Sequence, residues 1–207
     1  MIPAAEALER LREGNRRFAS GTRRATLPSS PEEWAALAKG QQPFAIILGC
    51  SDSRVPAEIV FDQGLGDLFV IRVAGNIVAP SQIGSVEFAA ERFGTRLVVV
   101  LGHSRCGAIL ATLEELLQPS ERQSRNLKSI VDRVRPSVET LLRSRLDADA
   151  VVDEAVRANV RASVDRLRHG SEILERLIER DGLLVVGAEY SLENGLVDFL
   201  DPAPGDA

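Results

Sequence analysis

The chain has 207 residues, of which 44% are hydrophobic and 27% charged, and 25 basic against 30 acidic side chains give a net charge of −5. This composition excludes a disordered or fibrous chain, and the acidic balance argues against a protein that coats nucleic acid. No apolar run approaches the ~20 residues of a membrane span, and the N-terminus lacks a secretory signal, so we expect a cytoplasmic protein with no membrane or nucleic-acid partner.

The first forty residues contain two predicted helices. Residues 4–20 place Leu8, Leu11 and Phe18 near one helical face, Gly14 weakens the middle of this helix, and Gly21 is a stop signal. A polar loop follows, and a short helix is predicted from Glu32 to Lys39. We expect residues 1–40 to form a helical arm in front of the core.

Four apolar runs predict the strands of a sheet. They lie at residues 44–48, 68–73, 97–101 and 183–186. Runs that are rich in Val and Ile and apolar on both faces are typical of central strands covered on both sides. Helices are predicted between the first three runs, at residues 55–63 and 81–93. The alternation of strands and helices indicates a parallel sheet.

The C-terminal half is predicted to be mostly helical. The stretch from Ala108 to Arg180 is helical in pattern, with breaks at Pro119 and Pro136, and Asn194-Gly195 predicts a hairpin within residues 188–200. The fold class is therefore α/β, with a central, mostly parallel sheet, flanking helices and a C-terminal hairpin or edge strand. We expect one domain over residues 1–207, with a core at 41–200 and a tail at 201–207.

Three potential metal ligands follow the ends of neighbouring predicted strands. Cys50 ends the first strand, and His103 and Cys106 follow the third. Open α/β sheets build their sites at this edge. Thiolate and imidazole are zinc ligands, and three protein ligands leave the open fourth position of a catalytic zinc site. Alternatively, each cysteine is simply a buried small residue; a redox pair is disfavoured, because the two belong to no C-x-x-C motif.

A carboxylate and an arginine stand close to the first of these ligands. Asp52 and Arg54 lie two and four residues after Cys50. Asp52 is near enough to bind zinc itself and close the site, whereas a bidentate pair with Arg54 would hold it away. Considered alone, the pair reads as a surface salt bridge.

Together these segments resemble the β-class carbonic anhydrases. The set Cys50-Ser51-Asp52-Ser53-Arg54 and His103-x-x-Cys106-Gly107 carries the resemblance, and LERLREGNRRFASG, GQQP and GDLFVIRVAGN extend it over nearly the whole chain. The resemblance implies one zinc per chain, held by two cysteines and a histidine that map onto Cys50, Cys106 and His103. It also implies reversible hydration of carbon dioxide to bicarbonate by a zinc-bound hydroxide, which the Asp52–Arg54 dyad orients. Asp52 would bind the metal only in a closed, inactive state.

The resemblance also implies a homodimer or higher homo-oligomer, with substrate pockets at the subunit interface. By motif position the pocket residues are Gln41 and Phe69, with Phe88 where many members have tyrosine. With Val73, the phenylalanines would form small apolar walls that suit a neutral linear substrate. Ile47 replaces a tryptophan that a subgroup of the family uses in an inhibitory bicarbonate site, so we do not predict that regulation.

Two other functions remain open from the sequence. Hydrolysis of carbonyl sulfide or carbon disulfide is performed by close relatives of this fold with the same zinc set. A non-catalytic zinc or bicarbonate-binding module, with Asp52 on the metal, is the alternative from another class, and the complete dyad argues against it.

Several single residues suit structural roles. Trp34, the only tryptophan, is expected to anchor its helix by packing. His169 lies near a predicted helix end, where a cation would offset the helix dipole. Arg16-Arg17 and Arg23-Arg24 are expected to be solvated or at subunit contacts.

Overall fold

The computed structural model describes residues 2–120 and 124–200, so the predicted tail at 201–207 lies outside the described residues. It confirms the α/β class, with a five-stranded sheet in the order β2-β1-β3-β4-β5. Four strands are parallel and β5 is antiparallel to β4, which confirms the C-terminal hairpin and edge strand. The strands are β1 (Ala45–Gly49), β2 (Leu68–Arg72), β3 (Leu97–His103), β4 (Leu184–Tyr190) and β5 (Val197–Phe199).

The helices agree with most of the expected segments. Residues 55–63 were expected to be helical, but only Ala57–Val60 is. The helix starts late because Val55 precedes a proline, which disfavours helix, and it ends early because Asp62 adopts a left-handed φ of 48°. Pro136 is not a break, because it lies in the last turn of α6, where it removes only one intrahelical bond. No helix of the described residues is both long and apolar enough to cross a membrane. The helices are α1 (Ala4–Ala19), α2 (Pro31–Ala38), α3 (Ala57–Val60), α4 (Pro80–Arg92), α5 (Gly107–Leu117), α6 (Arg125–Val138), α7 (Ala148–His169) and α8 (Glu172–Arg180), with 3-10 turns at Ala74–Asn76 and Leu141–Arg143.

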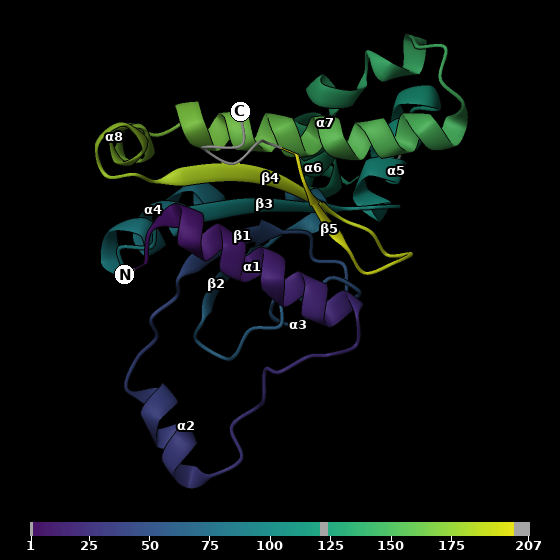
Figure 1. Ribbon diagram of the computed structural model, residues 1–207. Helices are drawn as coiled ribbons and strands as arrows, with labels where there is room; N and C mark the ends of the chain where they lie inside the picture. The colour runs from purple at the N-terminus through teal and green to yellow at the C-terminus, as the bar shows by residue number, and fades with distance from the viewer. Residues whose placement is uncertain (1, 121–123, 201–207) are drawn as a thin grey trace.

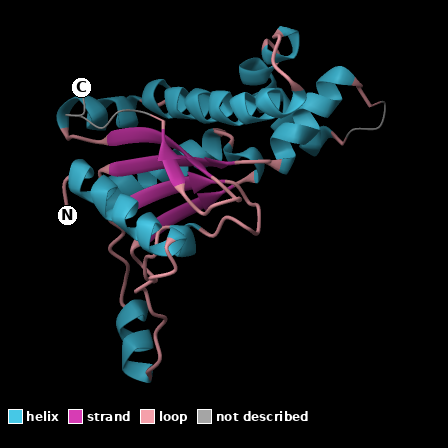
Figure 2. Cartoon of the chain, turned by 45° about the vertical axis from the view of Figure 1, so that its right-hand side comes forward, coloured by secondary structure: helices cyan, strands magenta, loops and turns pink. Residues whose placement is uncertain are grey.

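Helices cover both faces of the sheet (Figure 1). Side chains of a strand alternate between faces, and in β1 Ala45 and Ile47 pack toward α1 and α3, whereas Ile46 and Leu48 pack toward α4, α7 and α8. All of β1 and β3 is buried. The strands therefore read as continuous apolar runs, and their carboxyl ends emerge together at one edge of the layered core (Figure 2).

Helix α1 is fixed to the core by a close backbone approach and a buried charge. A Cβ at Gly14 would collide with the carbonyl oxygen of Phe61. Gly14 was expected only to weaken the helix, but it also allows α1 to pack closely against the backbone after α3. Arg17 Nε lies 2.6 Å from Asp62 Oδ2, and the Asp62 side chain is fully buried. Arg17 was expected to be solvated or at a subunit contact. It is instead an internal anchor, because its guanidinium balances the charge of a carboxylate that is buried in the core.

The second helix of the arm projects away from the sheet (Figure 1). A capping box at Ser30 and Glu33 starts α2, but none of its residues is buried against the rest of the described chain. Trp34 is 54% exposed, so the expectation that it anchors this helix by packing is wrong within one chain. Leu37 is half-buried near Gly66, but the other apolar side chains of α2 are exposed, because the helix stands apart from the core.

Candidate metal centre

The strand register brings the three predicted ligands to one edge of the sheet. Gly49 pairs with Leu101, so Cys50 and the end of β3 leave the sheet at nearly the same level. His103 is the last residue of β3, and Cys106 precedes the first residue of α5. One ligand atom from each of Cys50, His103 and Cys106 lies within 4.8 Å of the others, and all three residues are buried.

The His103 ring is oriented with one nitrogen free. Its Nδ1 lies 2.9 Å from the carbonyl oxygen of Ser104, and since a carbonyl only accepts, Nδ1 carries the hydrogen. Nε2 therefore presents a lone pair, and this buried atom has no hydrogen-bond partner among the described residues. A buried polar atom without a partner is costly. A metal ion among the three ligands would satisfy it.

The two cysteines form a coupled pair of thiols. Their sulfur atoms lie 3.9 Å apart, and the Gly75 amide donates to Cys50 Sγ over 3.4 Å. The hydrogen bond from Cys106 lowers the pKa of the Cys50 thiol, and the same bond raises the pKa of the Cys106 thiol. A second thiolate beside the first is disfavoured until a cation balances both charges. Two thiolates and an imidazole are a donor set that zinc accepts.

The predicted dyad is a bidentate ion pair. Arg54 Nε donates to Asp52 Oδ1 over 2.9 Å, and a terminal nitrogen of Arg54 donates to Oδ2 over 2.7 Å. These hydrogen bonds hold the pKa of the Asp52 carboxyl well below its usual range. Asp52 Oδ2 also lies 3.8 Å from His103 Nε2. The carboxylate therefore faces the space that the ligand atoms surround while the arginine holds it.

Arg72 contacts the loop that carries Cys50 and Asp52, a contact that was not predicted from the sequence. Its guanidinium donates to the carbonyl oxygen of Cys50 over 3.1 Å and to that of Asp52 over 2.6 Å. It ends β2 opposite Gly49, and so it reaches across to the loop that carries Cys50 and Asp52. An arginine at the end of a neighbouring strand is the only sequence signal for this contact.

The predicted substrate residues do not gather around the ligands within one chain. Val73 packs against the cluster that contains both cysteines. Phe69 and Phe88 pack with Phe93 instead, with ring centroids 5.7–6.1 Å apart, and Phe88 is 53% exposed. Gln41 is exposed at the end of the arm. Only Val73 is therefore placed beside the ligand cluster.

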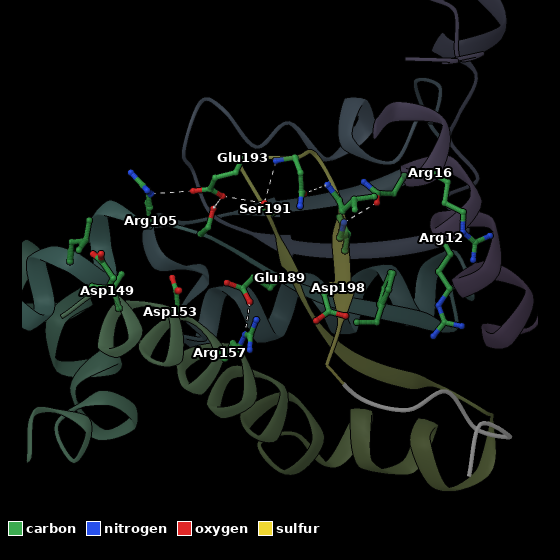
Figure 3. Close-up of a pocket in the computed structure, with 18 residues that line it drawn as sticks. Arg12, Arg16, Arg105, Asp149, Asp153, Arg157, Glu189, Ser191, Glu193 and Asp198 are labelled. Atoms are coloured by element: carbon green, nitrogen blue, oxygen red, sulfur yellow. Dashed lines mark hydrogen bonds and ion pairs between the residues drawn. The ribbon is translucent and has the colours of Figure 1, made fainter. Parts of the chain in front are cut away.

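An open cleft of about 1120 Å³ lies next to the loop between His103 and Cys106, and the three ligand residues are not part of its lining (Figure 3). Side chains of both charge signs line it, and Ser104 and Arg105 form the part of its rim that adjoins His103. The mixture of charges does not suit a small neutral substrate.

Comparisons with known proteins agree with this arrangement. The sequence model of the family described as carbonic anhydrase matches residues 45–197. Carbonic anhydrase 2 of Mycobacterium tuberculosis is 42% identical, over 91% of this chain and 89% of that protein. The carbonic anhydrase of Mycolicibacterium smegmatis is 39% identical, over 93% of this chain and 91% of that protein.

Solved structures show the same fold. The β-carbonic anhydrase CcaA superposes with a TM-score of 0.74 at 27% identity, covering 97% of this chain and 94% of that chain. A tetrameric β-carbonic anhydrase from Sordaria macrospora gives a TM-score of 0.72 at 27% identity, covering 84% of this chain and 88% of that chain. The chain therefore belongs to the β-carbonic anhydrase family, whose members are zinc enzymes with carbon dioxide hydration as their general reaction.

Proposed function

We propose that this chain converts carbon dioxide and water reversibly into bicarbonate and a proton, with one zinc ion held by Cys50, His103 and Cys106. The observation that carries the proposal is the convergence of the three donor atoms within 4.8 Å, with His103 Nε2 lacking a hydrogen-bond partner among the described residues. When bound, zinc would lower the pKa of a coordinated water and so supply a nucleophile near neutral pH.

Within this proposal, Asp52 orients the attacking water. Its carboxylate faces the ligand cluster, and its low pKa keeps it ionised as a hydrogen-bond acceptor. Arg54 occupies both carboxylate oxygens, so it fixes the direction of the remaining lone pairs. It would also compete with a bound zinc ion for this carboxylate, and so leave room for water beside the three ligands. Without Arg54, Asp52 would be the closing ligand of an inactive state.

We further propose a homodimer or larger assembly in which a second copy completes the substrate pocket. Gln41, Phe69 and Phe88 do not gather with Val73 around the ligands in one chain, and Phe88 is 53% exposed. The arm exposes Trp34 and α2 buries none of its residues against the described chain, so this segment is available to a second subunit. The Sordaria macrospora relative is tetrameric. The cytoplasmic location stays a prediction.

Stopped-flow measurement of carbon dioxide hydration with a pH indicator tests the reaction. We expect the zinc-loaded chain to be active and Cys106→Ser to lose both zinc and activity. Absence of hydration by the zinc-loaded oligomer would contradict the proposal. Carbonyl sulfide and carbon disulfide are assayed in parallel, and faster turnover of either one would assign the hydrolase function instead. Zinc and bicarbonate binding with no turnover of any of the three would indicate a binding module.

Light scattering combined with the same assay tests the assembly. Leu27, in the loop before α2, is 74% exposed. We expect Trp34→Ala, alone or with Leu27→Ala, to shift the protein toward a monomer of low activity. A monomer with the full activity of the wild type would show that no second copy is needed.

A further inference from the structure

The hairpin turn between β4 and β5 contacts the loop that carries two of the metal ligands. Glu193 of this turn accepts from the Ser104 hydroxyl over 2.8 Å and from the Ser191 hydroxyl over 3.1 Å. Its other oxygen pairs with Arg105 Nε at 3.1 Å. Figure 3 shows Glu193 between Arg105 and Ser191 on the rim of the cleft. A single carboxylate therefore joins the turn to two consecutive residues of the loop.

Those two residues separate His103 from Cys106, and the loop between them is tight. Arg105 has a φ of 53°, in the left-handed region that non-glycine residues rarely occupy. The loop adopts this conformation between two ligands that are three residues apart and converge on one point. An arginine in such a conformation is maintained only if contacts around it hold it there.

Ser104 transmits the position of the turn to the His103 ring. Its amide donates to the carbonyl oxygen of Tyr190 over 3.0 Å, and its hydroxyl accepts from the Leu192 amide over 3.0 Å. With its hydroxyl hydrogen directed to Glu193, Ser104 is bonded to β4 and to the turn at once. Its carbonyl oxygen fixes the hydrogen on His103 Nδ1, so Nε2 carries no hydrogen and presents its lone pair to a metal ion.

We infer that Glu193 is a positioning residue for the metal: through Ser104 and Arg105 it holds the His103–Cys106 loop in its ligating conformation. This inference rests on the proposed ligand set of Cys50, His103 and Cys106. An exposed ion pair alone contributes little. Here three donors meet on one carboxylate, and the loop they restrain ends in a metal ligand on each side. Loss of a direct partner of a ligating side chain typically weakens metal binding by about 10–100-fold; Glu193 acts one residue further out, through Ser104, so we expect the lower end of this range.

The test is the zinc dissociation constant, measured by competition with a chromophoric chelator. We expect Glu193→Ala to raise this constant about 10-fold and Glu193→Gln, which keeps one acceptor oxygen, to raise it less. Glu154→Gln is the matched control, because Glu154 also forms a solvent-exposed pair, with Arg161 at 2.8 Å, on the outer part of α7. It should leave zinc affinity within about twofold of the wild type.

Urea unfolding of the metal-free proteins separates positioning from general stability. We expect metal-free Glu193→Ala and Glu154→Gln to unfold at the same urea concentration as the wild type. Unchanged zinc affinity in Glu193→Ala would overturn the inference, and so would an equal loss of stability with and without zinc. A wild-type chain that binds no zinc, or Cys106→Ser with wild-type affinity, would instead overturn the ligand set on which the inference rests.

Discussion

Replacement of Asp62 tests how the N-terminal arm is held to the core. The fully buried carboxylate accepts from Arg17 Nε at 2.6 Å, from the Arg24 amide at 3.0 Å and from the Ala25 amide at 2.9 Å. Removing one partner of a buried ion pair costs about 3–5 kcal/mol. Arg17 is 24% exposed and so recovers some hydration. We therefore expect Asp62→Ala to lower the free energy of unfolding by about 3 kcal/mol and Asp62→Asn by about 2 kcal/mol.

This contribution should depend on pH in a defined direction. Burial alone would raise the pKa of Asp62, but hydrogen bonds from Ala25, Arg17 and Arg24 outweigh it, so the pKa lies below its ordinary value. A group whose pKa is lower in the folded state stabilises the fold above its unfolded pKa, about 3.9. The difference between wild type and Asp62→Asn should therefore be constant from pH 8 to about pH 5, and shrink as the pH falls below about 4.

Urea unfolding followed by circular dichroism at several pH values measures both effects. Asp132→Asn is the control, because Asp132 pairs with Lys128 on the exposed side of α6, and it should change stability by less than about 0.5 kcal/mol. An Asp62→Ala variant as stable as this control would refute the reasoning. A difference that stays the same from pH 7 to pH 3 would refute the electrostatic part of it.

Two further predictions concern the dyad and the packing of α1. Arg54→Ala should retain zinc but lose carbon dioxide hydration by at least about 100-fold, because the freed Asp52 closes the site. The double variant Asp52→Ala with Arg54→Ala should bind anions again, but its hydration rate should remain low. Near wild-type turnover of Arg54→Ala would contradict the gating role. Gly14→Ala should lower the free energy of unfolding by about 1–3 kcal/mol, because the new Cβ meets the Phe61 carbonyl oxygen. The helical control Gly84→Ala, whose Cβ meets no described atom within 4 Å, should be neutral or stabilising, and equal urea midpoints for the two variants would contradict the packing argument.

The sheet and the ligand cluster could be predicted because they follow from local pattern. Each central strand is an apolar run bounded by polar or glycine residues, and parallel strands bring their carboxyl ends to one edge. Cys50 and His103 come together because β1 and β3 are adjacent and parallel in the sheet. Asp52 and Arg54 are two residues apart, so their pairing also is a local matter.

The remaining contacts join residues that are distant in the sequence. Arg72 reaches the Cys50 carbonyl from 22 residues away, and Ser104 meets Glu193 across 89 residues. No periodicity indicates such pairs, because they depend on how loops lie over the finished sheet. The exposure of Trp34 was missed for a related reason: a helix pattern shows which residues are apolar but not whether their partner belongs to the same chain.

X-ray absorption at the zinc edge of the purified protein tests the central claim most directly. The account predicts one zinc per chain, with two sulfur ligands at about 2.3 Å and two nitrogen or oxygen ligands at about 2.0–2.1 Å. Two sulfurs and one nitrogen correspond to Cys50, Cys106 and His103, and the fourth ligand to water or, in the closed state, Asp52. A zinc ion with no sulfur ligand, or with four, would contradict the account.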